Sequence, residues 1–363
     1  MTRALEAGGN ASSVHANGRA ARGAVEVARE AVARLAGARA EDVIFTSGGT
    51  EANALALWGA VYGALEAEAR LTRIFVSAIE HSSVRANAEA IAARVAGVRM
   101  AEIPVTADGI VDVEALRVML REGKGRTLVC VMEANNETGA IQPIDAVAKH
   151  VCDAGALLLV DAVQAAGRID IACDADYLTL SAHKLGGPQG SGALIVKAGA
   201  PFASLIAGGG QERGKRGGTE NVAGIAGFGA AALIAAMRSD AARLTNLRDR
   251  FEAELLRRVP GTTIFAAGAP RLCNTSNFAL PGIAAETALM ALDLDGVMVS
   301  SGAACSSGKV RPSHVLKAMG VADDLASCAL RVSFGWNSTE SHVDAALAAL
   351  EKFVARARPR VAA

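Results

Sequence analysis

Seven short apolar runs between residues 43 and 196 constrain the fold of this 363-residue chain more than any other feature. Their hydrophobicity is continuous rather than alternating, and helical stretches separate them. Such strands are typical of a mostly parallel sheet with both faces covered by crossover helices. The runs are Val43–Thr46, Ile74–Ser77, Val98–Met100, Leu128–Met132, Leu157–Val160, Tyr177–Ser181 and Ala193–Val196. We therefore expect an α/β fold with ligands at the carboxyl ends of the strands.

The pattern changes after about residue 223, where an alanine- and leucine-rich stretch predicts one long helix as far as Val259. Three further strand candidates follow, at Thr275–Leu280, Val297–Ser300 and Leu330–Phe334. A final amphipathic helix is expected from about Glu340 to Ala357. The sequence thus predicts a large first domain over residues 1–238 and a smaller α+β domain over residues 239–363.

Charge and hydropathy exclude several classes of function. Lys plus Arg and Asp plus Glu balance at 37 each, so no basic field is present to attract nucleic acid or an anionic membrane. No apolar run approaches the roughly 18 residues of a membrane-spanning helix. The first residues contain no apolar signal-peptide core, which predicts a cytoplasmic location. A small-molecule enzyme fits this composition best.

The six cysteines lack the spacing of a zinc site or a disulfide framework. Cys130 lies in a strand-like run, and Cys152 and Cys328 lie among alanines on expected helices, so we expect all three to be buried. Cys305 differs, because the small and flexible residues around it show no periodic apolar pattern that would bury it.

The most informative motif is Ser181-Ala-His-Lys184-Leu-Gly-Gly, which follows an apolar run that ends at Asp161. A lysine flanked by His183 and Ser181 and followed by glycines is suited to bind an aldehyde cofactor covalently. Asp161 would be costly to bury unless it were paired, and a cationic ring nitrogen is such a partner. Gln164 follows closely enough to contact the same ring. The motif therefore indicates a pyridoxal 5'-phosphate (PLP) enzyme, with a surface loop lysine as the alternative.

Two polar segments near the amino terminus of the chain also follow expected strands. Gly49 and Thr50 open a helix, which is the geometry of a phosphate site, although such a turn is also an ordinary one. His81 directly follows another strand, where an imidazole can stack on a cofactor ring and move protons. A lone histidine is more often structural.

Two later segments carry similar alternatives. The amide of Asn135 can contact an oxygen of the cofactor, but Asn-rich turns also occur because they tolerate a left-handed backbone. The loop over residues 208–219 is rich in glycine, which lets the backbone approach an anion, and Thr219 offers a hydroxyl group. A mobile, solvated loop is the alternative.

Together these segments resemble the cysteine desulfurases, which are fold-type I PLP enzymes of the class V aminotransferase group. The resemblance extends over nearly the whole chain. The matching segments are Gly9–His15, Phe45–Glu51, Glu80–His81, Asn135–Pro143, Asp161–Gln164, Ser181–Lys184, Gly208–Thr219, Ser301–Cys305 and Pro312–Leu316. Each segment is modest alone, but the combination is highly specific.

The resemblance implies a role for each candidate residue. Lys184 would carry PLP, His81 would stack on its ring, and Asp161 would pair with the ring nitrogen. The contacts to the ring oxygen would come from Asn135 and Gln164. The phosphate would be held by Gly49, Thr50, Ser181 and His183, and by the partner subunit's Thr219 in a homodimer. The substrate carboxylate would be bound by Asn10 and Arg331, a role for which the guanidinium group is suited.

The resemblance also implies the reaction. The enzyme would convert L-cysteine to L-alanine and leave the sulfur on Cys305 as a persulfide, which a mobile segment carries to an acceptor scaffold protein. His81 would manage the proton of the thiol. The residues from Ala304 to His314 are similar to the long-loop members, which serve nitrogenase in nitrogen fixation or general iron–sulfur cluster assembly. In such members Cys305 would also be a transient iron–sulfur ligand, and no other metal ligand is expected.

Two departures from the family pattern leave alternatives open. Only nine residues precede Asn10, where family members usually begin with a longer segment that lines the active site, and Gln211 replaces a histidine of many relatives. We expect either that the chain was started downstream of its true beginning or that it lacks part of the cofactor pocket. The alternatives are another class V PLP enzyme, namely a selenocysteine lyase or an aminotransferase, or a cofactor-poor, non-catalytic partner in sulfur transfer.

Overall fold

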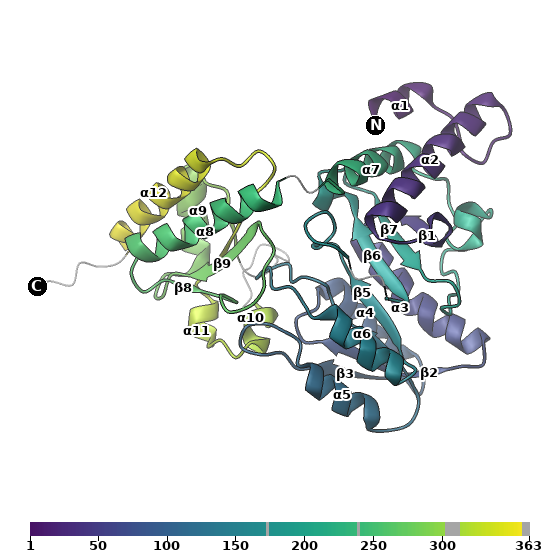
Figure 1. Cartoon of the computed structure of the whole chain (residues 1–363), viewed down its shortest axis with the longest axis horizontal. Coiled ribbons are helices and arrows are strands. Elements are labelled where there is room, and N and C mark those ends of the chain that lie inside the picture. The colour runs from purple at the N-terminus through teal and green to yellow at the C-terminus, as the bar shows by residue number, and fades with distance from the viewer. Residues whose placement is uncertain (172–173, 238–239, 302–312, 358–363) are drawn as a thin grey trace, which may run out of the picture. The chain divides into compact units, whose positions relative to one another are not determined.

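The computed structural model describes residues 1–171, 174–237, 240–301 and 313–357, and the chain forms two compact units (Figure 1). The first unit contains Met1–Ile103, Asp112–Glu133 and Gln142–Arg238. The second contains Pro104–Val111, Ala134–Ile141 and Ser239–Ala363. Two short segments therefore belong to the second unit although they lie between strands of the first in the sequence.

A seven-stranded sheet forms the centre of the first unit, in the order β1-β7-β6-β5-β4-β2-β3. Its strands are β1 Val43–Thr46, β2 Leu71–Ser77, β3 Arg99–Ile103, β4 Arg126–Cys130, β5 Leu157–Asp161, β6 Tyr177–Ser181 and β7 Gly192–Val196. Only β7 runs against its neighbours, and every other pair is parallel. The expected strands and the mostly parallel α/β sheet are confirmed.

Seven helices surround this sheet in the described part of the first unit. They are α1 Thr2–Ala7, α2 Ala16–Leu35, α3 Gly49–Glu66, α4 Ser82–Arg94, α5 Val113–Arg121, α6 Ile144–Asp153 and α7 Val222–Ala235. Three single turns of 3-10 helix are η1 Ala40–Asp42, η2 Ala182–Leu185 and η3 Gln211–Gly214. Helices α2 and α7 lie side by side (Figure 1), and a Cβ on Gly229 would come within 2.5 Å of Ala28 Cα. Small residues thus set this close helix contact.

Helix α3 packs into the core of the first unit, and its composition explains why. It has apolar residues nearly all around its circumference, as expected for a helix that neighbours cover on several sides. Gly63 lets the chain at Phe202 approach its backbone, because a Cβ at Gly63 would lie 2.3 Å from Phe202 N. The same core contains the central strands and the inner face of α4.

The second unit is an antiparallel sheet covered by helices. Its strands, in the order β10-β11-β9-β8, are β8 Thr263–Ile264, β9 Thr275–Ala279, β10 Ser300–Ser301 and β11 Ala329–Ser333. Its helices are α8 Ala241–Arg258, α9 Ala285–Leu294, α10 His314–Ala318, α11 Asp323–Ala326 and α12 Glu340–Ala357. The rings of Phe251, Phe278 and Phe334 meet in its core. This part of the chain has the α+β character expected from the sequence.

Two expected elements of the later chain are wrong. The single helix to Val259 is two helices, α7 and α8, because their apolar residues pack into the cores of different units. The expected strand at Val297–Ser300 begins only at Ser300. Val297 instead closes the capping turn that follows α9, since Gly296 has a φ of 78° and the Val297 N–H donates to Leu292 O at 2.8 Å.

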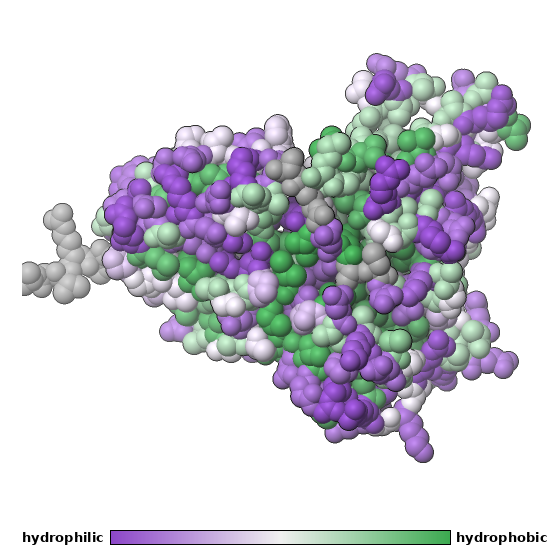
Figure 2. Space-filling view, viewed as in Figure 1, coloured by the Kyte–Doolittle hydropathy of each residue, from purple (hydrophilic) through white to green (hydrophobic). Residues whose placement is uncertain are grey.

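Charged and polar residues are distributed widely over the surface. In Figure 2, hydrophilic side chains cover much of the visible face of each unit, in keeping with the equal totals of acidic and basic residues. None of the helices that the structure describes combines the length and the apolar character needed to cross a membrane.

Candidate active site

Four strands of the first unit end at the same edge of the sheet, and the polar segments lie there. Strands β1, β2, β5 and β6 all run in one direction. Residues 47–50 follow β1, His81 follows β2, Asp161 ends β5, and residues 182–184 follow β6. The fold therefore gathers at one edge the residues that the sequence separates by more than a hundred positions.

Asp161 is the buried carboxylate of this edge, with 6% of its surface exposed. Its Oδ2 accepts a hydrogen bond from Asn53 Nδ2 at 2.8 Å, and its Oδ1 accepts one from the Val163 N–H at 3.0 Å. Burial raises the pKa of Asp161, while these hydrogen bonds and the charges of His81 and Lys184 oppose the rise. Within the described residues both donors to Asp161 are uncharged, so a bound cation would stabilise it.

Asn53 connects Asp161 to the residues after β2, and the sequence reasoning missed it. It lies on α3 with 1% of its surface exposed, and its Nδ2 also donates to Ser83 Oγ at 2.9 Å. Its Oδ1 accepts a hydrogen bond from Thr179 Oγ1 at 2.7 Å. The one signal in the sequence was an amide inside a helix that is otherwise apolar on all sides.

His81 caps α4 and ends the chain of contacts that starts at Asp161. Its Nδ1 accepts a hydrogen bond from the Ser83 N–H at 3.1 Å and lies 2.8 Å from Ser83 Oγ. The ring is half-buried, and Nε2 makes no hydrogen bond to any residue that the structure describes. Nδ1 therefore has a structural role as the cap of α4, whereas Nε2 can contact another partner.

Lys184 lies on η2, directly after β6, and is half-buried. Arg168 joins this turn to the segment after β5, because its Nη2 donates to Lys184 O at 2.9 Å and its Nη1 donates to Gln164 O at 2.8 Å. Burial and then the charge of Lys184 lower the pKa of His183. The same charge opposes the rise in the pKa of Asp161. Lys184 is thus close enough to act on the buried carboxylate, unlike a solvated loop lysine.

The start of α3 lies beside the segment after β6. A Cβ on Gly49 would lie 3.0 Å from Val163 Cγ2 and 3.5 Å from Ser181 Cβ. Ser181 Oγ lies 2.9 Å from His183 Nδ1. Thr50, in the same first turn, is exposed. The free N–H groups at this helix start and the nearby hydroxyl and imidazole groups form a suitable environment for a phosphate.

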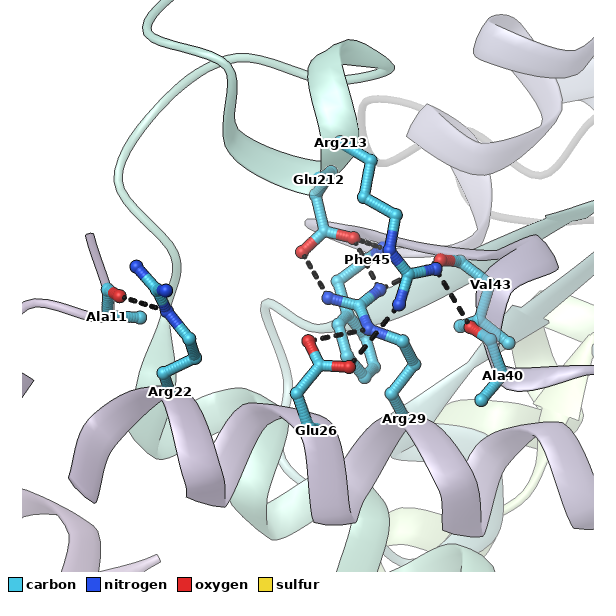
Figure 3. A network of polar contacts seen from close by, with 9 residues as sticks. All are labelled: Ala11, Arg22, Glu26, Arg29, Ala40, Val43, Phe45, Glu212 and Arg213. Carbon is cyan, nitrogen blue, oxygen red and sulfur yellow. Dashed lines mark hydrogen bonds and ion pairs between the residues drawn. The ribbon is translucent and has the colours of Figure 1, made fainter. Parts of the chain in front are cut away.

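A buried ion pair holds the glycine-rich loop of residues 208–219 (Figure 3). Arg29 on α2 donates from Nη1 and Nη2 to the two carboxylate oxygens of Glu212, at 2.7 and 3.0 Å. Glu212 also accepts a hydrogen bond from the Phe45 N–H at 2.9 Å, and Arg29 donates to Val43 O at 2.8 Å. The guanidinium lies 4.8 Å from the centre of the Phe45 ring. The solvated-loop alternative is therefore wrong for this part of the loop.

A second ion pair ties the same loop to the start of α3. Arg216 Nε donates to Glu51 Oε1 at 2.8 Å, and the Ser47 N–H donates to Glu51 Oε2 at 2.8 Å. Burial by itself raises the pKa of Glu51, but the hydrogen bonds from Arg216 and Ser47 outweigh it, so the pKa is lowered. Thr219 is exposed near the end of this loop. The loop is therefore fixed on both sides of a bend while Thr219 faces solvent in the single chain.

Asn10 takes part in a local turn. It is exposed, and its Oδ1 accepts a hydrogen bond from the Ser12 N–H at 2.8 Å. In the described part of the chain it makes no hydrogen bond to the residues around Asp161. The structure therefore does not join Asn10 to that cluster.

Asn135 and Arg331 both belong to the second unit. Asn135 Oδ1 accepts hydrogen bonds from the N–H groups of Glu137 and Thr138, both at 2.9 Å, as the turn alternative predicts. Arg331 on β11 donates from Nη1 to Asn136 O at 2.7 Å. This unit therefore brings the Asn-rich turn and the arginine together.

Glu137 is a buried carboxyl of this turn that the sequence reasoning did not single out. It is 4% exposed and accepts a hydrogen bond from Ser313 Oγ, which also caps α10. Burial raises the pKa of Glu137 to about 7, while Ser313 and the charge of Arg331 oppose the rise. Burial in turn lowers the pKa of Arg331, and Glu137 opposes that change.

Glu80 is another buried carboxyl that the sequence reasoning did not single out. It has no exposed surface and accepts a hydrogen bond from the Met132 N–H. Burial and then the charge of Asp161 raise the pKa of Glu80 to about 8, while the Met132 N–H and Arg85 oppose the rise. Glu80 therefore remains largely protonated at neutral pH, which limits repulsion between these two acids.

The cysteines agree only in part with the sequence. Cys130 is fully buried as predicted, and burial raises its pKa. Cys328 is buried but lies between α11 and β11 rather than on a helix. The prediction for Cys152 is wrong: it is exposed, because Ile144, Val147 and Val151 form the buried stripe of α6. Cys305 lies outside the described residues.

Comparison with known proteins shows the family of this chain. The Aminotransferase class-V profile matches residues 4–346. A cysteine desulfurase of Cereibacter sphaeroides is 43% identical over 96% of this chain and 89% of that protein. The cysteine desulfurase IscS of Dictyoglomus turgidum is 39% identical over 96% of this chain and 88% of that protein.

A solved structure gives the same result for the fold. The X-ray structure of a NifS-like protein from Rickettsia africae has a TM-score of 0.86 and 33% identity, and the match covers 97% of this chain and 93% of that one. These findings confirm the resemblance and the fold class expected from the sequence, and enzymes of this family depend on PLP. The chain belongs to the class V aminotransferase family, among proteins similar to the cysteine desulfurases.

Proposed function

We propose that this protein is a PLP-dependent cysteine desulfurase that converts L-cysteine to L-alanine and transfers the sulfur to Cys305. The observation that carries the proposal is the buried Asp161 carboxylate, which has only neutral hydrogen-bond donors and lies near Lys184 and His81. The relatives at 38–43% identity are named cysteine desulfurases, which favours this reaction over a selenocysteine lyase or an aminotransferase.

The residues at the carboxyl edge of the sheet fit PLP. Asp161 offers a carboxylate to a protonated ring nitrogen, and Gly49 lets the start of α3, with its N–H groups, lie close to Ser181. We assign the covalent attachment to Lys184. The proposed cofactor-binding residues are Gly49, Thr50, Asn135, Asp161, Gln164, Ser181, His183 and Lys184.

PLP, when bound, withdraws electrons from the α-carbon of an amino acid, and a protonated ring nitrogen strengthens this effect. Asp161 keeps that nitrogen protonated, because the buried carboxylate gains most from a cationic neighbour. Lys184 holds the cofactor and moves the α-proton of the substrate. These two side chains interact electrostatically, which supports assigning them to one reaction.

Sulfur transfer needs no further oxidant. The Cys305 thiolate attacks the sulfur of L-cysteine, an S–S bond forms, and the C–S bond of the substrate breaks. The electron pair of that bond stays with the substrate carbon, which takes up a proton and becomes the methyl group of alanine. We assign hydrogen bonding and proton management at the sulfur atoms to His81, whose Nε2 has no partner among the described residues.

Arg331 has a guanidinium suited to the substrate carboxylate. Its Nη1 donates to Asn136 O, which fixes the group, while Nε is buried without a hydrogen-bond partner in the described structure. A carboxylate bound by this guanidinium would satisfy the remaining donors. We also assign Asn10 to the substrate carboxylate, by resemblance to the family.

We extend the proposal to two protein partners. The partner subunit's Thr219 would complete the phosphate site in a homodimer, in keeping with a loop that is firmly anchored yet leaves this residue exposed. The persulfide of Cys305 would pass its sulfur to a scaffold protein for iron–sulfur cluster assembly, with Cys305 as a transient cluster ligand. A relative named IscS supports this assignment.

Incubation of the purified protein with PLP and L-cysteine tests the reaction. We expect alanine to form and Cys305 to gain the mass of one sulfur atom, as measured by amino-acid analysis and mass spectrometry. The Cys305→Ser variant should do neither, whereas Cys152→Ser, which changes the exposed cysteine of α6, should do both. Alanine formation that is unchanged in Cys305→Ser would refute the persulfide role.

A further inference from the structure

The hydrogen bond between Asn53 and Asp161 sets the direction of the other hydrogen bonds around Asn53. A carboxylate only accepts hydrogen bonds, so the NH2 group of Asn53, and not its oxygen, must face Asp161 Oδ2 at 2.8 Å. The opposite side of the amide agrees, because Thr179 Oγ1 donates to Asn53 Oδ1 at 2.7 Å. All three residues are buried, with exposed fractions of 1%, 6% and 0% for Asn53, Asp161 and Thr179. The amide orientation is thus fixed from both ends.

This orientation determines what the Ser83 hydroxyl can do. The second hydrogen of the Asn53 NH2 group points to Ser83 Oγ at 2.9 Å, so that oxygen acts as an acceptor. Its own hydrogen then remains for His81 Nδ1, which lies 2.8 Å away. The Ser83 N–H donates to the same nitrogen at 3.1 Å. Two donors therefore face His81 Nδ1.

A ring nitrogen that accepts two hydrogen bonds carries no proton, so the proton of the neutral imidazole must be on the other nitrogen. We propose that Asn53 and Ser83 are positioning residues that place the proton of the neutral His81 imidazole on Nε2. The hydrogen-bond chain runs from Asp161 through Asn53 and Ser83 to His81. Both intermediate residues are buried, with exposed fractions of 1% for Asn53 and 6% for Ser83.

What this tautomer does in catalysis rests on the proposed function, in which His81 manages protons at the sulfur atoms. In this form Nε2 offers an N–H donor to a thiolate or to the substrate sulfur. Proton uptake by the ring is restricted to Nδ1, where the Ser83 hydroxyl would have to turn away. His81 therefore stabilises negative charge on sulfur by donating a hydrogen bond from Nε2. A change at Asn53 or Ser83 weakens the preference of the ring proton for Nε2 over Nδ1.

Nuclear magnetic resonance of the 15N-histidine-labelled full chain, with and without bound PLP, tests the proposal at mildly alkaline pH. Long-range 1H–15N correlations distinguish the two ring nitrogens, and the His81→Gln spectrum assigns the signal among the six histidines. We expect wild-type His81 to carry its proton on Nε2. In Ser83→Ala the share with the proton on Nδ1 should rise about fivefold, the factor that one neutral hydrogen bond contributes to an equilibrium.

Two asparagine variants form a matched pair. Asn53→Leu removes the donor to Ser83 Oγ and should, like Ser83→Ala, raise the share of His81 that carries its proton on Nδ1. Asn87→Leu removes an amide that donates to the backbone oxygen of Ser83 at 2.7 Å, and it should leave His81 unchanged. A wild-type signal with the proton on Nδ1, or an unchanged balance in Ser83→Ala, overturns the proposal, even if Asn53→Leu does not fold.

The readout separates this proposal from the proposed function, because it needs no turnover. Alanine formation from L-cysteine together with a proton on Nδ1 would leave the desulfurase proposal standing and refute the positioning role. The expected signal without any alanine formation would do the reverse.

Discussion

The first unit buries charge in two different ways. In the Arg29 cluster a guanidinium faces the Glu212 carboxylate, with side-chain exposures of 4% and 3%, and the Glu26 carboxylate and backbone groups make the remaining hydrogen bonds. In the Asp161 cluster a carboxylate is equally buried but has only an amide and a backbone N–H as donors. The Glu212 carboxylate thus has a cationic partner within the chain, whereas the Asp161 carboxyl has only uncharged donors.

The difference indicates which cluster is structural and which is a binding site. Burial by itself lowers the pKa of Arg29, but the hydrogen bonds and the charge of Glu212 raise it more. The ion pair is therefore stable without any ligand. Burial prevails at Asp161, whose pKa is raised. A buried carboxylate in this state is stabilised by a cation that arrives from outside the chain. The Arg29 cluster therefore anchors the loop, and this difference supports our proposal that the Asp161 cluster binds the cofactor.

The largest effect is expected from breaking the complete pair. Arg29→Met leaves Glu212 buried without its cation and should lower the free energy of unfolding of the first unit by about 3–5 kcal/mol. Denaturant unfolding followed by Trp58 fluorescence in a Trp336→Phe background measures this, because the protein has two tryptophans. The double variant Arg29→Met/Glu212→Met should regain much of the loss. A loss no larger than that of Arg22→Met, on the same helix, would contradict the anchoring role.

The second effect concerns the unpaired carboxylate. Asp161→Asn keeps the shape and removes the charge, so affinity for PLP should fall by about 2–3 kcal/mol, or roughly 30- to 150-fold in Kd. Titration with PLP, followed by absorbance, measures the change. Unlike Arg29→Met, this variant should not destabilise the cofactor-free protein. Asp176→Asn, at a carboxyl that accepts a hydrogen bond from the Leu158 N–H, should leave PLP affinity unchanged.

The third effect is a pH dependence near the unpaired carboxylate. The pKa of Glu80 rises from 4.5 to about 8, so the folded protein retains a proton that the unfolded chain releases. This contribution to stability is complete below about pH 4.5 and is lost as the pH rises through about 8.

Between pH 6 and pH 7 the first unit should therefore lose about 1 kcal/mol of unfolding free energy through this group. Glu80→Gln should flatten the dependence, and unfolding midpoints across this pH range measure it. An equally steep loss in Glu80→Gln would show that another group is responsible.

The smallest effect is expected at the half-buried pair of Arg216 and Glu51, with side-chain exposures of 22% and 17%. Arg216→Met should lower the unfolding free energy by about 1 kcal/mol or less, and high salt should reduce the difference, because solvent screens such pairs. Denaturant unfolding at low and high salt checks both points. Arg117→Met, at an exposed pair with Glu114, is the control and should have no effect.

Much of the fold could be predicted because apolar pattern is a local property. The seven strands of the large sheet and the final helix were recognisable from runs of apolar residues. The break between α7 and α8 was not, since both halves are helical and only the cores into which they pack differ. The same reason explains Cys152, whose position on the outer face of α6 depends on which stripe is buried.

The candidate site divides in the same way. Lys184, Asp161 and His81 follow strands whose direction is set by the fold class, so their position at one edge could be expected from the sequence. Asn53, Thr179 and Glu80 could not, because each takes its meaning from contacts with residues far away in the chain. The two ion pairs of the loop were invisible for the same reason.

The order of apolar runs and chemically distinctive residues by itself determined the α/β fold and the family, and it led to the assignment that we propose for the lysine and the acid. Only the tertiary structure decided which buried charges are neutralised within the chain and which are not. The physical reason is that pairing depends on distances of about 3 Å between side chains, and such distances arise only when the strands and helices pack.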